Sequence, residues 1–233
     1  MAFLFTRLFR NIVLVLVLGS AVQFLLRIKS YTISPKDFRT ISVKAAGSNG
    51  ATSVQKLMAD LRRTYGPHLI PENEQQWLPV SPGGAQLRVK FAHASFTEYL
   101  AIFSAPFTTS GRSGIHWVNS TCTVLTGSVS RYVDSPNNVN KEAFNPGDNL
   151  RHGQFESAVY ELTADTHLAC YGRGFIPVSA LWLNAGSITN GDPIAIARLA
   201  YVYGGAMVRE TMMWGQSTFS YYKNKALNGR SEL

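Results

Sequence analysis

An apolar stretch runs from Phe9 to Leu26, interrupted by four polar residues, Arg10, Asn11, Ser20 and Gln23. A helix rising 1.5 Å per residue over this length would cross the hydrocarbon core of a bilayer. Basic residues flank the stretch on both sides, so their distribution does not fix an orientation. We predict a membrane anchor over residues 1–30. The alternative is a cleaved signal peptide, because Gly19–Ala21 has the small residues of a cleavage site.

Two patterns in the next part of the chain predict a helix and a strand. Apolar residues recur at helical spacing over residues 54–63, and Gly66–Pro67 ends that helix. From Leu87 to Phe91 apolar and polar residues alternate, which is the period of a half-exposed strand. In the segment 97–103, Leu100 and Ile102 are as apolar as the residues on either side of them, which fits a strand buried on both faces and also a helix.

The middle of the chain favours β-structure. Trp117–Tyr132 is rich in Thr, Val and Ser and predicts one or two strands. Ala158–Leu162 and His167–Tyr171 are expected to pair as a hairpin. Short strands at this spacing indicate a mainly β fold, an antiparallel sandwich or barrel. Pro193–Tyr222 then predicts one or two amphipathic helices that lie on the bilayer or cover a barrel mouth.

Composition narrows the partners. A chain of 233 residues that is 45% apolar suffices for one domain and an anchor, here a sandwich or barrel domain over residues 31–190 and C-terminal helices over 191–233. The net charge is +8, but the 22 Lys and Arg residues are scattered, which argues against nucleic acid and favours an anionic membrane surface. Two cysteines form no disulfide framework, and neither they nor the histidines have metal-ligand spacing. We predict no metal and no cofactor.

Two motifs carry a family resemblance: His93-Ala-Ser-Phe-Thr-Glu-Tyr99 and Tyr171-Gly-Arg-Gly-Phe-Ile-Pro177. Further matches in the same order are Gln76-Trp77 with Gly83-Gly84, Ser113-Gly114 with Trp117, and Phe144-Asn-Pro-Gly-Asp148 with His152. Together they resemble the C-8 sterol isomerase and sigma-1 receptor family. The anchor and the C-terminal helices match the layout of that family too.

The resemblance implies a cupin-like β-barrel without metal, whose apolar interior holds a sterol or a lipophilic amine. Its C-terminal helices would close the barrel against the endoplasmic reticulum membrane, and a homotrimer is allowed. The sterol isomerases of the family protonate a double bond and remove another proton, so a carbocation forms between the two steps. A buried carboxylate stabilises such a cation and also captures protonated amines.

Both cysteines stand at family acid positions. By the resemblance, Cys170 replaces the central glutamate, and Cys122 replaces the aspartate that partners it in the receptor branch. A thiol donates a proton poorly to an alkene and does not offset a cation unless it ionises. The two residues, as facing strand neighbours, would allow a disulfide or a reactive thiol pair. We favour two small buried residues that fill the space of the missing acids.

The other matched positions supply neutral groups. His152 would lie inside the cavity as a general acid, with Asp148 orienting it, or a tyrosine such as Tyr99 or Tyr160 would serve. The alternative for His152 is an ordinary polar residue at a loop edge. Glu98 alternates to the opposite face from Tyr99, and we expect it to be structural. The expected cavity-lining residues are Tyr99, Phe103, Cys122, Tyr160, Cys170, Ile176 and Tyr203.

We therefore predict a membrane-bound isomerase or cyclase that acts on a lipophilic isoprenoid or terpenoid through a protonated, carbocation-like intermediate in specialised metabolism. Aromatic faces stabilise such a cation by roughly 0.5–2 kcal/mol each. Two alternatives stay open. One is a non-catalytic, sigma-receptor-like binder of a neutral lipid, and the other is a C-8 sterol isomerase that works without the glutamate.

Overall fold

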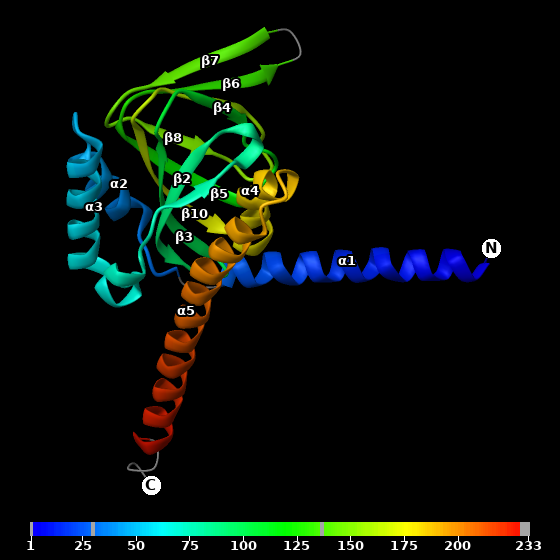
Figure 1. The fold of residues 1–233 in the computed structure, drawn as a ribbon. Coiled ribbons are helices and arrows are strands. Elements are labelled where there is room, and N and C mark those ends of the chain that lie inside the picture. The colour runs from blue at the N-terminus through cyan, green and yellow to red at the C-terminus, as the bar shows by residue number, and fades with distance from the viewer. Residues whose placement is uncertain (1, 29–30, 136–137, 229–233) are drawn as a thin grey trace. The chain divides into compact units, whose positions relative to one another are not determined.

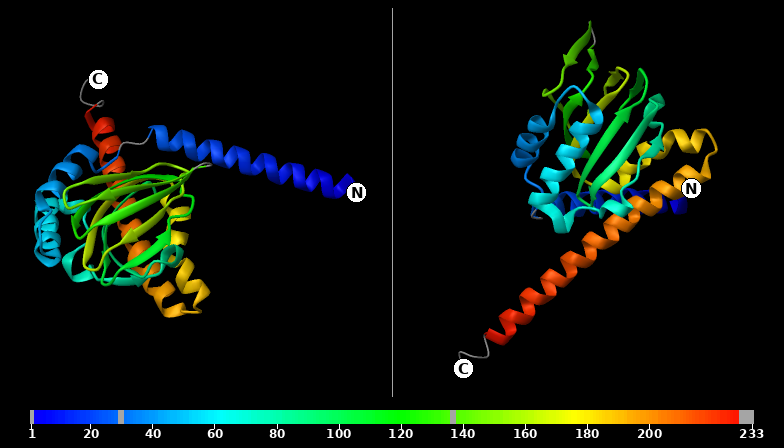
Figure 2. Two further views of the ribbon diagram at one scale, coloured as in Figure 1. Left: turned by 90° about the horizontal axis from the view of Figure 1, so that it is seen from above. Right: turned by 60° about the vertical axis from the view of Figure 1, so that its left-hand side comes forward.

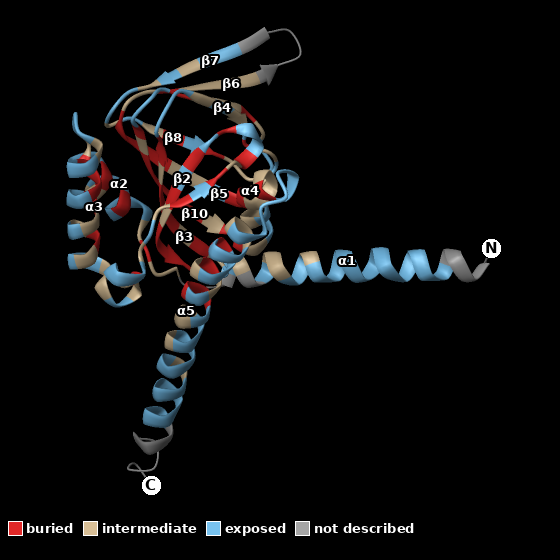
Figure 3. Ribbon diagram, viewed as in Figure 1, coloured by how far each residue is buried: buried red, intermediate tan, exposed pale blue. Residues whose placement is uncertain are grey.

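The computed structural model describes residues 2–28, 31–135 and 138–228. The chain divides into two compact units, Met1–Thr32 and Ile33–Leu233. The first unit contains helix α1 (Ala2–Ile28), whose described side chains are mostly exposed (Figure 3). Within the described ranges, one helix is long and apolar enough to cross a membrane, over Thr6–Phe24.

The second unit is built on two antiparallel sheets that share an apolar core (Figures 1 and 2). The larger sheet has the order β1 (Leu78–Val80), β2 (Leu87–Ala94), β3 (Glu98–Ala105), β10 (Thr166–Gly174), β5 (Val118–Thr126), β8 (Asn149–His152). The smaller sheet has the order β4 (Thr109–Arg112), β9 (Val159–Leu162), β6 (Val129–Ser135), β7 (Asn138–Phe144). The inner faces of both sheets enclose the candidate site.

Two helices cover the outer face of the larger sheet (Figure 1). They are α2 (Pro35–Ala45) and α3 (Gly50–Tyr65). Asn49 is the N-cap of α3, and its side chain accepts hydrogen bonds from the first backbone N–H groups of the helix. Phe38 and Leu57 pack with Leu100 and Ile102 of β3 in a second core. Strand β3 is therefore buried on both faces, which explains why its sequence shows no polar alternation and resolves the choice between strand and helix.

The C-terminal helices close one opening between the sheets. Helices α4 (Ile176–Thr189) and α5 (Pro193–Asn228) pack against β1, and α5 also packs against β2 (Figure 2). Leu183 of α4 and Leu199 and Tyr203 of α5 belong to the inner core. The second unit also contains three short 3₁₀ helices: η1 (Gly66–His68), η2 (Glu72–Glu74) and η3 (Pro82–Gly84).

Two fold predictions need correction. The chain is about half helical, so the fold is mixed rather than mainly β. The prediction underestimated the helix content, because it missed α4 and because α5 is one long helix. The predicted hairpin of residues 158–162 and 167–171 is wrong. Strand β9 pairs with β4 and β6, whereas β10 pairs with β3 and β5. The link between β9 and β10 crosses from one sheet to the other, and Asp165 turns there with a φ of 57°.

Candidate functional site

A cavity lies between the two sheets and beneath the C-terminal helices. About 150 Å³ of it admits the centre of a water molecule. Both sheets, α4 and α5 supply its lining, which is mostly aliphatic and aromatic. Among the described residues that line it there is no Asp, Glu, Lys or Arg. The cavity is thus suited to a neutral, lipophilic molecule.

Most of the residues expected from the sequence meet at this cavity. The structure brings together Tyr99, Phe103, Cys122, His152, Tyr160, Cys170, Ile176 and Tyr203. They come from β3, β5, β8, β9, β10, α4 and α5, so the fold collects them from widely separated parts of the chain. Their roles in binding or catalysis stay predictions.

Asp148 is the expected site residue that does not line the cavity. It is exposed, and its carboxylate accepts the backbone N–H of Asn145 at 2.8 Å. Asp148 therefore closes the turn before β8, and the structure does not bring it to His152 as we expected. The hydroxyl of Tyr160 takes that orienting position instead.

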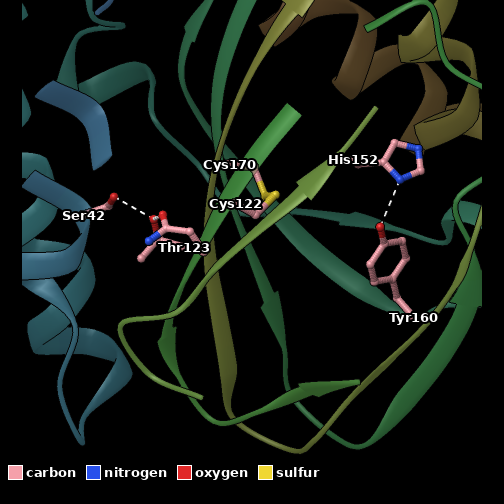
Figure 4. Close-up of a disulfide and its surroundings, with 7 residues drawn as sticks. Ser42, Cys122, Thr123, His152, Tyr160 and Cys170 are labelled. Carbon is pink, nitrogen blue, oxygen red and sulfur yellow. Dashed lines mark hydrogen bonds between the residues drawn. A yellow bond between two sulfur atoms is a disulfide. The ribbon is translucent and has the colours of Figure 1, made fainter. Parts of the chain in front are cut away.

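His152 stands at the end of β8 and is 7% exposed. Its Nδ1 lies 2.9 Å from the Tyr160 hydroxyl, and the two side chains point toward one another in Figure 4. Burial lowers the pKa of His152, and the nearby His116 and Arg131 lower it further, although Glu156 acts in the opposite direction. The imidazole is therefore mainly neutral at pH 7.

Tyr160 connects His152 to a charged pair outside the cavity. Burial raises the pKa of Tyr160, while the charge of Arg131 and a hydrogen bond with it act in the opposite direction. Arg131 Nε donates to Glu142 Oε2 at 2.8 Å, and Arg131 Nη1 donates to the Arg151 carbonyl at 2.5 Å. A fixed guanidinium, a phenol and an imidazole thus follow one another from the smaller sheet to the cavity wall.

Two more tyrosines present hydroxyl groups to the cavity. Burial raises the pKa of Tyr99, although a hydrogen bond with Ser120 opposes that effect. Gly172 of β10 makes room for the Tyr99 ring, because a Cβ atom there would lie 2.2 Å from a ring carbon. Tyr203 packs its ring 5.5 Å from that of Phe91, and its buried hydroxyl has no partner among the described residues. Burial raises the pKa of Tyr203 as well.

Cys122 and Cys170 form a disulfide in the cavity wall (Figure 4). Our expectation of two unlinked buried residues is wrong. The two positions are directly opposite each other in the antiparallel pairing of β5 and β10, so their side chains leave the same face within bonding reach. A disulfide carries neither a proton nor a charge, so neither sulfur replaces a carboxylate in function.

Three residues of the two family-like motifs, Glu98, Tyr171 and Arg173, meet on the opposite face of the larger sheet. The Tyr171 hydroxyl lies 2.9 Å from both Glu98 Oε2 and the Ile33 carbonyl. Arg173 donates to the Tyr171 hydroxyl at 2.6 Å and to the Ile33 carbonyl at 2.8 Å. Glu98 also accepts the backbone N–H of Ile33 and is fully buried. This network holds the segment before α2 against β3 and β10, as the structural interpretation of Glu98 anticipates.

Comparison with known proteins gives the family. The sequence profile described as ERG2 and Sigma1 receptor like protein matches residues 9–215. The chain belongs to this family. Among its relatives, the sigma non-opioid intracellular receptor 1 of Taricha granulosa is 32% identical over 76% of this chain and 80% of its own length. The receptor of the same name from Xenopus tropicalis is 30% identical over 87% of this chain and 92% of its own length.

Solved structures with some likeness are more distant than these relatives. KdgF from Halomonas sp. is 13% identical over 46% of this chain and 92% of its own, with a TM-score of 0.37. A RmlC-like cupin from Shewanella frigidimarina is 9% identical over 46% of this chain and 90% of its own, with a TM-score of 0.36.

This member of the ERG2 and Sigma1 receptor family departs from the charged centre that the resemblance implies. The disulfide occupies both positions where acids were expected, and the described lining contains no carboxylate. In the described part of the chain, no group of three or more His, Cys, Asp and Glu side chains has an arrangement that could hold a metal ion.

Sequence reasoning missed the cavity residues His116, Ser179 and Trp182. The His116 ring lies 5.8 Å from His152 and 5.0 Å from Trp182 between centroids, and its Nε2 contacts the Ser113 carbonyl. Burial lowers the pKa of His116. His116 lies inside the segment from Ser113 to Trp117 that matches the family, and this match could have indicated it. Ser179 and Trp182 belong to α4, which the sequence did not predict, so no pattern pointed to them.

Proposed function

We propose that the protein is a membrane-associated enzyme that isomerises or cyclises a neutral lipophilic isoprenoid or terpenoid inside the cavity between its sheets. The observation that carries the proposal is an uncharged, largely apolar cavity that contains one hydrogen-bonded histidine–tyrosine pair, His152 and Tyr160. Burying a hydrocarbon chain there gains roughly 25 cal/mol per Å² of apolar surface. The absence of a described carboxylate in the lining argues against a protonated amine as the ligand.

The reaction needs a proton donor and a base. The minor imidazolium form of His152 gives its proton to one carbon of the substrate double bond, and the positive charge develops on the other carbon. The neutral imidazole that results takes a proton from an adjacent carbon, so the double bond shifts and the enzyme is restored. Aromatic faces such as those of Tyr99 and Phe103 stabilise the cation by roughly 0.5–2 kcal/mol each.

We also propose that α1 anchors the protein in the endoplasmic reticulum membrane. The support is the apolar length of Thr6–Phe24 and the name of the relatives, which are intracellular receptors. A lipophilic substrate partitions into that bilayer, so a membrane-held cavity takes it from the place where it accumulates.

The test is turnover by the full chain in microsomes supplied with neutral polyprenyl substrates, followed by mass spectrometry of the products. His152→Gln keeps the size and polarity of the side chain but removes the titrating imidazole, and we expect at least a 100-fold loss of turnover, in line with general acid–base catalysis. Asp148→Asn is the matched control, because Asp148 lies outside the cavity, and its turnover should match the wild type. Full activity of His152→Gln would refute the assignment of the acid.

The second candidate is a non-catalytic binder of a neutral lipid. The observation that favours it is the lowered pKa of His152, which keeps most of the imidazole neutral at pH 7. Saturable binding of polyprenyl compounds without any product would support the binder. Growth rescue of a sterol isomerase deletion would instead show that the family reaction survives the loss of both acids.

A further inference from the structure

Three polar atoms at the cavity wall lack a hydrogen-bond partner within the described part of the chain. They are His152 Nε2, the Tyr203 hydroxyl and the Ser179 hydroxyl. His152 and Tyr203 are 7% and 8% exposed, so both are more than nine-tenths buried. Buried polar atoms are normally satisfied, and a set of unsatisfied ones on residues that line one cavity indicates an occupant with polar atoms of its own.

The contacts of Tyr160 decide which nitrogen of His152 carries the proton. Arg131 and Tyr160 lie directly opposite each other in the pairing of β6 and β9, and the charge of Arg131 lowers the pKa of the Tyr160 phenol against the effect of burial. A phenol is a stronger acid than the N–H of a neutral imidazole, so Tyr160 is the donor in its hydrogen bond with His152. The single phenolic proton of Tyr160 is then available for His152 Nδ1, 2.9 Å away. A neutral imidazole that accepts at Nδ1 carries its hydrogen on Nε2. The unpartnered nitrogen of this cavity-lining residue is therefore an N–H donor.

The environment fixes this arrangement. Arg131 cannot turn away from Tyr160 freely, because Glu142 and the Arg151 carbonyl hold its other N–H groups. Arg131 also opposes a second proton on His152, because its positive charge lies close by. Arg131 is thus a positioning residue that acts on the cavity through Tyr160.

We propose that the ligand of the cavity is an oxygenated neutral isoprenoid, whose carbonyl, epoxide or hydroxyl oxygen accepts a hydrogen bond from His152 Nε2. A pure hydrocarbon offers no acceptor and leaves the N–H unsatisfied. A protonated amine offers only donors and places N–H against N–H. The hydroxyl groups of Tyr203 and Ser179 rotate to donate or accept, so they accommodate further oxygens. This inference rests on the proposed function, namely that the cavity holds an isoprenoid.

The first test compares three probes with one C15 skeleton: farnesal, which carries a carbonyl oxygen, β-farnesene, which carries none, and farnesylamine. Equilibrium binding to the detergent-solubilised full chain should favour farnesal over β-farnesene by about 3- to 10-fold, the effect of one neutral hydrogen bond. His152→Leu should remove this preference, while His152→Gln, whose side-chain amide still donates, should keep part of it.

The outcomes separate this inference from the proposed function. Equal binding of farnesal and β-farnesene to the wild type would overturn the oxygen contact and leave an isoprenoid-binding cavity. Binding of none of the three probes would overturn both. Loss of turnover in His152→Gln together with retained farnesal preference would support both, because the amide donates a hydrogen bond but does not transfer a proton.

The second test reads the tautomer directly. Nitrogen-15 spectra of the histidine-labelled full chain, with the His152 signal assigned by its loss in His152→Gln, should show hydrogen on Nε2. Arg131→Met removes the positive charge beside Tyr160, which makes its phenol a weaker donor to Nδ1, and should shift the signal toward a mixture of tautomers. Hydrogen on Nδ1 in the wild-type protein would overturn the assignment.

Discussion

Burial keeps the two histidines at the cavity, His116 and His152, mainly neutral. His116 and His152 have ring centroids 5.8 Å apart, and burial lowers the pKa of both. A charge on His116 further disfavours a charge on His152. At neutral pH, therefore, only a small fraction of these imidazoles is protonated. His152 is then mainly a neutral group that can donate a hydrogen bond.

Stability should fall as the pH is lowered below about 6.5, the ordinary pKa of histidine. Because the pKa of His116 and of His152 is lowered in the folded state, the unfolded chain binds more protons between that value and the folded ones. The stabilising effect is fully present above pH 6.5 and is lost as the pH falls through the folded pKa values. Urea unfolding at a series of pH values measures it. His152→Gln should flatten the profile between pH 7.5 and 5.5, and an unchanged slope would contradict the account.

Tyr203→Phe should separate binding from stability. The Tyr203 hydroxyl is buried without a described partner, so its removal should leave the free energy of unfolding of the ligand-free chain unchanged or raise it by about 1 kcal/mol. Tyr171→Phe is the matched comparison, because it removes a buried hydroxyl that contacts Glu98 and Ile33, and it should destabilise by about 1–3 kcal/mol. A strong destabilisation by Tyr203→Phe would reveal a partner for its hydroxyl in the folded protein.

Single elements differ in how far the sequence predicts them. Helix α3 and the first half of strand β2, residues 87–91, follow from periodicity alone, because each buries one face and leaves the other more exposed. Helix α4 was missed because its apolar residues are not confined to one face, and it follows β10 without a side-chain cap. The pairing of β9 was wrong because neighbours in the chain cross between sheets here, and short-range patterns do not record which sheet a strand joins.

The disulfide shows the same limit at the level of two strands. Cys122 and Cys170 are 48 residues apart, and only the register of β5 against β10 places them opposite each other. The resemblance placed both residues near one site, but the bond depends on pairing that no local pattern reports. The other five expected cavity-lining residues likewise depended on the resemblance rather than on periodicity: Tyr99, Phe103, Tyr160, Ile176 and Tyr203.

Loss of the disulfide should destabilise the second unit without removing the cavity. The double variant Cys122→Ala/Cys170→Ala removes a cross-link that restricts the unfolded chain, for an expected cost of about 2–4 kcal/mol in the free energy of unfolding. Urea unfolding with and without reductant measures this. The wild type should lose a similar amount on reduction, and the double variant should not respond to reductant. A wild type that is indifferent to reductant would show that the bond is not formed in the isolated protein.

At the scale of the whole molecule, the chain divides into an apolar helix and a compact unit that holds the site. Length and apolarity alone predicted α1, whereas the position of the cavity required the fold, because its walls come from both sheets and two helices. The lining is uncharged although the chain carries a net charge of +8. The charged side chains of the described residues thus lie outside the cavity wall, either at the surface or, like Glu98, in the network on the opposite face of the larger sheet.

Helix α1 should be retained as a membrane anchor in the mature protein. An epitope tag at the N-terminus should stay on the chain and remain in the membrane pellet after alkaline carbonate extraction, whereas cleavage near Gly19–Ala21 would remove the tag. Leu16→Arg places a charge in the middle of the apolar stretch, at an expected cost of about 2.5–3.5 kcal/mol for insertion, and should shift the protein toward the supernatant. Leu16→Phe is the matched control, because it changes size but not polarity and should leave the distribution as in the wild type. If Leu16→Arg stays in the pellet as firmly as Leu16→Phe, the exposed apolar side chains of α5, such as Met212, Trp214 and Phe219, hold the protein at the membrane instead.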